Sequence, residues 1–416
     1  MLIAQFMIPL VLFLAVILSS CSELRSSKEC TDPLGCIVIG SGEPVKIGVL
    51  QALSGKVAPL GQAQTRGLEL VLDKRGNSLL DHPVALQIED TGCTPEGGAN
   101  AALKIIADPQ TIAIFGTTCS GAAATASKAI SSAGLTMISG NNSAPFLTSI
   151  AGLAAPDWQP GYFRTAANEE HAGQAAAGYV FKQLGLQRAA TIHDNDIYTR
   201  GLTESFSKAF TALGGEIVLD TAINKGETEM EPVLTAVIHS QAQVLFFPLF
   251  QDEGINILRQ ARALSALEST LLISDGALIQ KSFLEEAGEL AKGMYFVGPS
   301  SPKGPAVEQL AAAYEEKYKE QPTVSYYLSG YDAADLLVHA IDRVAIRDED
   351  GTLHIGRKAL REQLYNTSHF KGVTGTLNCN RFGDCTRPAF DVLHLENPSL
   401  GLEGLLANVV FSYTSN

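Results

Sequence analysis

The chain has 416 residues, and its 30 basic and 44 acidic side chains give a formal net charge of −14. No cluster of Lys and Arg occurs along it, so nucleic acid is a poor partner. The length exceeds what one hydrophobic core normally serves and indicates two lobes, which implies a cleft between them.

The N-terminal segment is typical of a bacterial lipoprotein signal. An uncharged apolar run of 13 residues extends from Phe6 to Leu18 and is followed by Ser19-Ser20-Cys21. The run is too short for an ordinary spanning helix but suits a signal peptide. We expect residues 1–20 to be removed, Cys21 to be lipidated and residues 21–43 to form a tether; the alternative is a cleaved signal with a free Cys21. Either places the mature chain outside the cytoplasm, and lipidation anchors it to the cell membrane.

Cysteine usage agrees with an extracytoplasmic location. Of 7 Cys, setting aside Cys21 leaves 7 − 1 = 6, an even number that suits three disulfides. Two of the expected pairs enclose short loops, Cys30 with Cys36 and Cys379 with Cys385. The two remaining cysteines, Cys93 and Cys119, then pair with each other. Six reduced core cysteines are the alternative. A zinc site, or any other metal site, is not expected, because no Cys-x-x-Cys pair and no suitably spaced His occur.

Strands and helices then alternate in the pattern of a doubly wound parallel α/β lobe. The expected strands are Val45–Leu50, Val84–Glu89, Ile112–Phe115 and Thr136–Ile138, with helices at Gly61–Arg75, Pro95–Asp108 and Ser120–Ala133.

A second parallel α/β series follows and predicts a second lobe. Its strands are Arg188–His193, Glu216–Leu219, Val244–Phe247 and Thr270–Ser274, and its helices are Glu169–Leu184, Tyr198–Leu213, Glu229–Ser240 and Gln251–Ala263. Later helices at Pro305–Tyr318, Ser325–Arg347 and Gly356–Tyr365 lack the strands of a third sheet, so we expect them to return to the first lobe.

Motifs of enzymes and cofactor sites are missing or incomplete. Gly40-Ser41-Gly42 lacks the third glycine of a dinucleotide loop and indicates a linker, and Gly55-Lys56 lacks the rest of a phosphate loop. Asp348-Glu349-Asp350-Gly351 lacks the remaining ligands of a calcium loop and indicates a solvated turn. Neither Gly-x-Ser-x-Gly nor His-Glu-x-x-His occurs. We expect no cofactor and no catalysis.

Polar residues follow two adjacent strands of the first lobe, where doubly wound sheets collect ligands. Gly116–Gly121 contains Ser120 at a helix start, and Ser139–Pro145 forms a second polar lip containing Asn141, Asn142 and Ser143. Hydroxyls and free amide groups there suit a carboxylate. The alternative is that these residues are only helix caps.

Two strand ends of the second lobe supply complementary groups. His193–Tyr198 follows one strand and Ser274-Asp275-Gly276 another. The Asp275 carboxylate suits an ammonium group, unless it is only a turn aspartate. Tyr198 either stacks on a ligand or covers the helix start.

In combination and in order, several of these segments resemble the substrate-binding lipoproteins of branched-chain amino acid ABC importers, which are type I periplasmic binding proteins. The similar segments run from Val45 to the C-terminus: Val45–Leu50 with Leu53–Gly55, Gly61–Ala63, Asp90 with Cys93, Gly116 with Cys119–Ser120, Ala144–Pro145, and His193–Asp194 with Tyr198. The resemblance implies three crossovers, near Thr165, Gly298 and Gly375. Lobe 1 would then hold residues 44–165 and 298–374, and lobe 2 residues 166–297 and 375–416.

The resemblance also implies a role for each site residue. Ser120 corresponds to the carboxylate-binding serine, the lip of Asn141, Asn142 and Ser143 to a surface shared by the ligand's two charged ends, Tyr198 to the tyrosine of the second lobe, and Asp275 to the ammonium-binding acid. Asp275 is shorter than the glutamate usual in that position, and Leu60 and Phe250 replace tyrosines in the side-chain pocket. The Cys93–Cys119 disulfide has a family counterpart, whereas Cys30–Cys36 lies in an N-terminal extension that the resemblance does not cover.

The sequence therefore predicts a monomeric, lipid-anchored receptor that binds an amino acid, branched-chain or otherwise apolar, and presents it to ABC permease subunits. The alternatives are a receptor for an amide, urea or aromatic acid, a ligand-sensing module of a signalling system, and an enzyme of the cleft.

Overall fold

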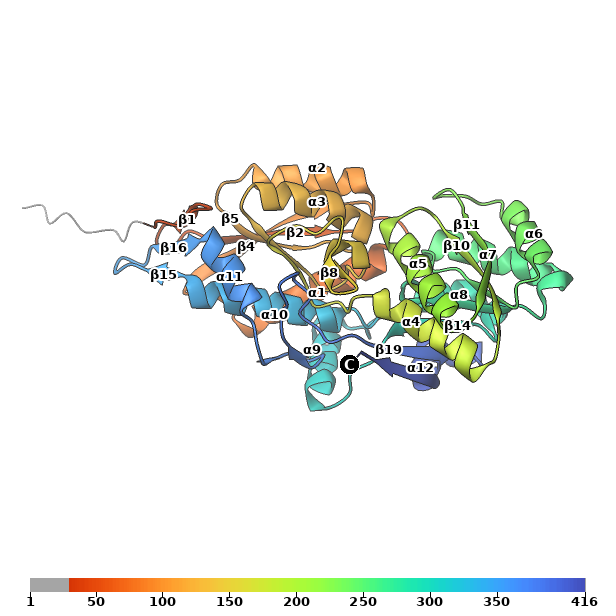
Figure 1. Cartoon of the computed structure of the whole chain (residues 1–416). Helices are drawn as coiled ribbons and strands as arrows, with labels where there is room; N and C mark the ends of the chain where they lie inside the picture. The colour runs from red at the N-terminus through yellow and green to blue at the C-terminus, as the bar shows by residue number, and fades with distance from the viewer. Residues whose placement is uncertain (1–29, 416) are drawn as a thin grey trace, which may run out of the picture.

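The computed structural model describes residues 30–415, which form two α/β lobes joined side by side (Figure 1). The predicted signal peptide, Cys21 and the start of the tether lie outside the described residues. No helix within the described part is long and apolar enough to cross a membrane.

Lobe 1 is built on a six-stranded sheet of order β3-β4-β2-β5-β6-β9, parallel except for β3. The central strands are apolar runs because helices cover both faces of such a sheet. Its strands are β2 (Val45–Gln51), β3 (Ser78–Leu79), β4 (His82–Asp90), β5 (Thr111–Gly116), β6 (Thr136–Ser139) and β9 (Tyr162–Arg164). Its helices are α1 (Ala58–Lys74), α2 (Pro95–Ile106), α3 (Ser120–Ser132), α9 (Pro305–Tyr318), α10 (Tyr327–Val344) and α11 (Arg357–Tyr365).

Lobe 2 is built on a seven-stranded sheet of order β11-β10-β12-β13-β14-β19-β20. The first five strands are parallel, and β19 and β20 add an antiparallel edge that the sequence did not suggest. The strands are β10 (Arg188–His193), β11 (Glu216–Ala222), β12 (Val244–Phe246), β13 (Leu271–Asp275), β14 (Tyr295–Pro299), β19 (Ala389–His394) and β20 (Val409–Thr414). The helices are α4 (Glu170–Gly178), which continues as a π-helical turn over Tyr179–Gln183, and α5 (Ile197–Ala212), α6 (Glu231–Ser240), α7 (Gln251–Ala263), α8 (Lys281–Ala287) and α12 (Gly401–Ala407). The predicted α/β architecture of both lobes is confirmed.

Shorter elements complete the fold. Two strand pairs stand apart from the main sheets, β7 (Ser149–Ile150) with β8 (Leu153–Ala154), and β17 (Phe370–Lys371) with β18 (Thr376–Leu377). Single 3₁₀ turns occur at Pro145–Leu147, Ser265–Leu267, Gly276–Leu278, Gly288–Ala291 and Pro398–Leu400.

The prediction that residues 21–43 form a tether is wrong for the second half of this segment. Residues 36–39 form β1 (Cys36–Ile39), which pairs antiparallel with β16 (Leu353–Gly356) beside β15 (Ile346–Arg347). Ile37 and Ile39 are buried in lobe 1. Buried and more exposed side chains alternate along β1, which is typical of a strand that packs against the core with one face only.

Three chain crossings join the lobes, and the third was placed too early. The first two fall between β9 and α4 and between β14 and α9. Residues 376–386 still contact lobe 1, because Arg164 N donates to Gly383 O (2.9 Å) and Cys385 N to Arg164 O (3.0 Å). The chain enters the second sheet only at β19, so the boundary lies after residue 386 and not near Gly375. The Cys379–Cys385 disulfide closes this added loop.

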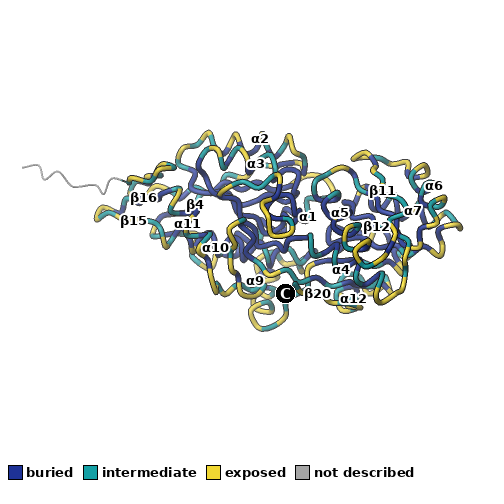
Figure 2. The backbone as a smooth tube through the Cα atoms, in the orientation of Figure 1, coloured by how far each residue is buried: buried dark blue, intermediate teal, exposed yellow. Residues whose placement is uncertain are grey.

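The packing of the core explains the return of the late helices to lobe 1. Figure 2 shows buried backbone through the centre of each lobe and exposed backbone at the periphery. Gly67 of α1 permits close contact with α10, since a Cβ there would lie 2.6 Å from Tyr331 N.

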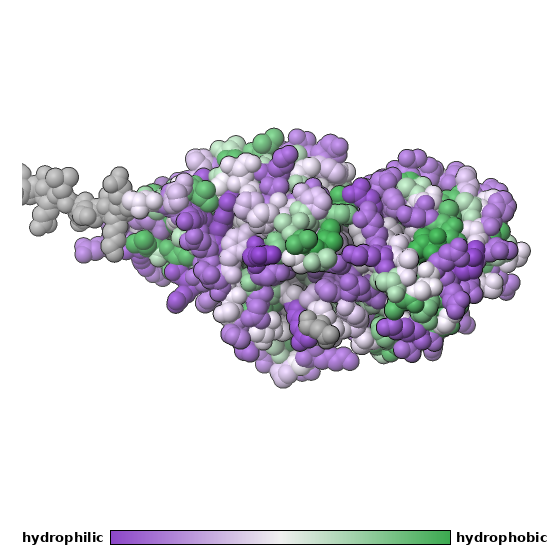
Figure 3. Space-filling view, viewed as in Figure 1, coloured by the Kyte–Doolittle hydropathy of each residue, from purple (hydrophilic) through white to green (hydrophobic). Residues whose placement is uncertain are grey.

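The visible surface is mostly hydrophilic, with hydrophobic side chains in separate small groups (Figure 3).

All three predicted disulfides are present. Cys30 pairs with Cys36, Cys93 with Cys119, and Cys379 with Cys385. The second one joins the ends of two neighbouring loops of lobe 1 beside the start of α3, and it thereby positions Ser120.

Candidate functional site

A small cavity lies where the two lobes meet, and it brings together most of the predicted site residues. Its volume is about 20 Å³, room for about one water molecule. Six predicted residues line it: Leu60, Ser120, Asn141, Ser143, Tyr198 and Phe250. Thr118, Cys119, Ala277 and Tyr326 complete the wall. An amino acid needs more space, so its entry requires the lobes to move apart.

The lobe 1 wall offers donors for an anion. Ser120 is the first residue of α3, a helix whose initial amides have no acceptor within the helix. Its hydroxyl accepts a hydrogen bond from Ala144 N (3.2 Å), which ties the helix start to the polar lip. The helix dipole and these amides favour negative charge at this end of the cavity.

The lip itself is held rigidly by Ser139, whose hydroxyl accepts from the backbone amides of Asn141 and Asn142 (3.0 Å each). Asn141 donates through Nδ2 to Thr118 O (2.9 Å), while its buried Oδ1 has no hydrogen-bond partner among the described residues. That oxygen is an unused acceptor on a cavity-lining side chain. Asn142 does not line the cavity, because its side chain bonds inward to Thr117 and Tyr162.

Two buried carboxylates lie beside the cavity. Ser143 donates to Glu169 Oε2 (2.6 Å), and Tyr198 donates to Asp275 Oδ2. Burial, and after it the charge of Asp275, raise the pKa of Glu169 to about 8. Burial also raises the pKa of Asp275 to about 7, although the hydrogen bond from Tyr198 opposes the rise. Asp275 does not line the cavity itself; it accepts a hydrogen bond from Tyr198, which does.

The remaining walls are apolar. Phe250 precedes α7 and stacks on Tyr198, with ring centroids 5.3 Å apart. Leu60 of α1 is 2 % exposed and faces the same cavity from lobe 1. These side chains suit an apolar group on a ligand whose charged ends are bound elsewhere.

The lobes are closed over the cavity, and two lysines span them. Lys56 of lobe 1 forms ion pairs with Glu286 (3.0 Å) and Asp252 (3.4 Å) of lobe 2. Lys225 of lobe 2 donates to Cys93 O (3.4 Å) in lobe 1 and lies 5.0 Å from the Phe250 ring centroid. These contacts stabilise the closed arrangement.

An ion pair between the fully buried Arg164 and the mostly buried Asp384 supports the lip from behind. Arg164 Nε donates to Asp384 Oδ1 (2.7 Å), and Nη1 donates to Ala144 O (2.8 Å). Burial acts to raise the pKa of Asp384, but the Arg164 charge and hydrogen bonds from Thr148 and Ser149 outweigh it and lower that pKa. The loop closed by Cys379–Cys385 thus helps to position the site.

Sequence reasoning missed Glu169, Thr118, Ala277 and Tyr326. Glu169 follows a buried strand, as the predicted polar residues do, so the same rule applied after β9 would have found it. Thr118 lies within the segment already singled out. No comparable signal marks Tyr326, which reaches the cavity from the start of α10.

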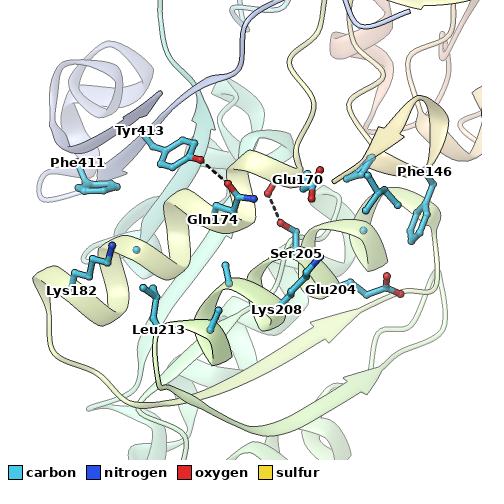
Figure 4. Close-up of a pocket in the computed structure, with 16 residues that line it drawn as sticks. Phe146, Glu170, Gln174, Lys182, Glu204, Ser205, Lys208, Leu213, Phe411 and Tyr413 are labelled. Carbon is cyan, nitrogen blue, oxygen red and sulfur yellow. Dashed lines mark hydrogen bonds between the residues drawn. The ribbon is translucent and has the colours of Figure 1, made fainter. Parts of the chain in front are cut away.

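A second, larger cavity lies elsewhere. It is a groove of about 570 Å³ between α4 and α5, with Phe411 and Tyr413 of β20 on one side and Phe146 on the other (Figure 4). Tyr413 donates to Gln174 (2.6 Å) there. None of the predicted site residues lines this groove, so it is distinct from the central cavity.

Known proteins resemble this chain along most of its length. The periplasmic binding protein family model matches residues 44–386. Leu/Ile/Val-binding protein homolog 3 of Brucella melitensis is 25% identical over 363 residues, covering 86% of this chain and 94% of that protein. The leucine-specific-binding protein of Salmonella typhimurium is 27% identical over 331 residues, covering 77% of this chain and 86% of that protein.

Solved structures share the fold. A leucine-binding protein, LivK, from Thermotoga maritima has a TM-score of 0.74 at 22% identity, covering 89% of this chain and 98% of its own. A solute-binding protein from R. palustris in complex with benzoate has a TM-score of 0.72 at 24% identity, covering 88% and 97%. The family match, the relatives' names and the two-lobed fold agree, and this chain belongs to the periplasmic binding proteins, extracytoplasmic solute-binding proteins that are not enzymes.

Proposed function

We propose that this protein is the receptor of an ABC importer and that it captures an apolar α-amino acid in the central cavity. The carrying observation is an anion-binding wall at Ser120 together with three acceptors: Asn141 Oδ1, which is unpaired on the wall, and the carboxylates of Glu169 and Asp275, which are bonded to the wall residues Ser143 and Tyr198. A primary ammonium has three N–H donors, which matches this number of acceptors.

The ligand's side chain is proposed to lie against Leu60 and Phe250. Relatives named Leu/Ile/Val-binding proteins support this assignment, as does a structural neighbour, LivJ from Streptococcus pneumoniae, in complex with isoleucine. Closure follows because such a ligand contacts both lobes only when they are together, so binding shifts the hinge equilibrium toward the closed form that a permease receives.

An aromatic acid is the second candidate. Tyr198, Phe250 and Tyr326 line the cavity, and two structural neighbours are complexes with benzoate and 3,4-dihydroxybenzoic acid. Such a ligand has no ammonium group, so it leaves Glu169 and Asp275 without a cationic partner. A thermal-shift screen of amino acids, amides and aromatic acids tests the assignment. We expect leucine, isoleucine or valine to raise the melting temperature; stabilisation by aromatic acids alone would replace the amino-acid receptor with the second candidate.

We also propose that Cys21 carries the lipid anchor. The apolar run and the small residues before Cys21 support this. A Cys21→Ala precursor is expected to incorporate no labelled fatty acid and to lose membrane association while its ligand binding persists, because the lobes begin beyond that residue. Acylation of the variant at the wild-type level would show that the lipid is attached elsewhere.

A further inference from the structure

The two buried acids beside the cavity form a pair without a basic partner. Glu169 is 1 % exposed and Asp275 is 0 % exposed. Each accepts a hydrogen bond from a neutral hydroxyl, Ser143 or Tyr198, and within residues 30–415 neither forms an ion pair. Each acid would have to ionise in a buried site without a counter-charge, and the charge of Asp275 further disfavours ionisation of Glu169.

The groups that face this pair leave its charge uncompensated. Arg164 on β9 lowers the pKa of Glu169, but its guanidinium already bonds to Asp384 and to Ala144 O. The other titratable neighbours are Tyr198 on α5 and Tyr326 before α10, and burial raises the pKa of both well above the usual range, so they stay neutral. Because burial raises the pKa values of Glu169 and Asp275 to about 8 and about 7, the closed protein without ligand holds a proton on the pair near neutral pH.

We propose that capture of an amino acid displaces a proton from the Glu169–Asp275 pair, so that the receptor binds more tightly as the pH rises. This inference rests on the amino-acid receptor proposed above. The ammonium enters as R–NH₃⁺, the protonated carboxyl loses its O–H proton, and one H⁺ leaves for the solvent. An ammonium only donates hydrogen bonds, so a carboxylic O–H aimed at it makes no bond, whereas a carboxylate accepts one.

A cavity at the hinge, separate from the groove between α4 and α5, gives the proton a way out of the closed protein. This hinge cavity has a volume of about 100 Å³, and Glu169 lines it. Its walls include all three chain crossings, at residues 165–167, at residues 299–302, and at residues 386, 387 and 389. Ser143 and Tyr326 line both this cavity and the central one. The space is large enough for several water molecules, so an acceptor reaches Glu169 even when the lobes are together.

Calorimetry with L-leucine as the probe tests the inference. At pH 7.5 we expect the apparent binding enthalpy to differ between phosphate and Tris buffers by an amount that corresponds to about one released proton per leucine. Affinity is expected to rise at least about tenfold from pH 6 to pH 7, because the complex binds fewer protons than the free protein.

Two matched variants assign the proton. Glu169→Gln keeps an acceptor for Ser143 but has no acidic proton, so the number of protons released should fall to less than half and the pH dependence should flatten while leucine still binds. Glu170→Gln, a change at the neighbouring acid that bonds to Ala151 N outside the pair, should behave as wild type. Leucine binding with equal heats in both buffers overturns the inference alone. Failure of leucine and of every other amine to bind at any pH overturns the proposed function and the inference together.

Discussion

Replacing Asp275 with alanine is expected to weaken the binding of leucine by about 2–5 kcal/mol, the range for truncating one partner of a buried charge pair. The ligand's ammonium would be left desolvated against Tyr198 with one acceptor fewer. Isothermal titration calorimetry at pH 7.5 measures the loss. Ser120→Ala is the comparison and should cost less, about 1–3 kcal/mol, since the amides at the start of α3 still serve the carboxylate.

Stability separates a binding defect from a folding defect in the Asp275 variant. Burial raises the pKa of this acid from 3.8 unfolded to about 7 folded. Its contribution to stability is therefore full below pH 3.8 and is lost as the pH rises through about 7. At pH 8 the free Asp275→Ala protein should be at least as stable as wild type. If the Asp275→Ala variant binds leucine as tightly as wild type does, Asp275 does not bind an ammonium group, and the aromatic-acid receptor is favoured.

Replacing Asp384 with alanine is expected to lower the free energy of unfolding by about 3–5 kcal/mol, because Arg164 would remain buried without its counter-charge. Urea denaturation of the oxidised protein measures the change. The double variant Arg164→Met with Asp384→Leu is the matched control and should recover part of the loss, since it leaves no unpaired charge.

The contribution of Asp384 to the free energy of unfolding depends on pH with the opposite sign to the contribution of Asp275. The Arg164 charge lowers the pKa of Asp384, so the stability it provides is present above the unfolded value of 3.8 and is lost as the pH falls below it. The difference between wild type and Asp384→Ala should therefore narrow in acid. An unchanged unfolding midpoint in the variant at pH 7 would mean that solvent reaches Arg164.

Local patterns predicted most parallel strands of both sheets and the polar part of the cavity wall, whereas Leu60 and Phe250 came from the family resemblance. Apolar runs mark the buried parallel strands, and polar residues directly after them mark the edge where ligands bind, which is how Ser120, Asn141 and Tyr198 were found. Strands β9 and β14 were not predicted, and neither were the antiparallel edge strands β19 and β20. Strand β19 pairs with β14, which is distant in the chain, and β20 pairs with β19.

Other features depend on contacts that no local pattern contains. Asn142 has the same side chain as Asn141, yet the Asn142 side chain points away from the cavity because it bonds to Thr117 and Tyr162. The third crossing was misplaced because residues 376–386 are held to lobe 1 by backbone bonds to Arg164. The pairing of Glu169 with Asp275 required knowing how the lobes meet.

If Cys21 carries a lipid, as proposed, the position of β1 sets how far the receptor can move from the membrane. Figure 1 places β1 and β16 at the end of lobe 1 farthest from lobe 2. From Cys21 to Cys30 the chain has 30 − 21 = 9 residue steps, which span at most about 30 Å when fully extended. This short connection would keep the β1 end of lobe 1 close to the bilayer, while lobe 2 would point away from the membrane. Each loaded receptor would then search for its permease within a thin layer at high effective concentration.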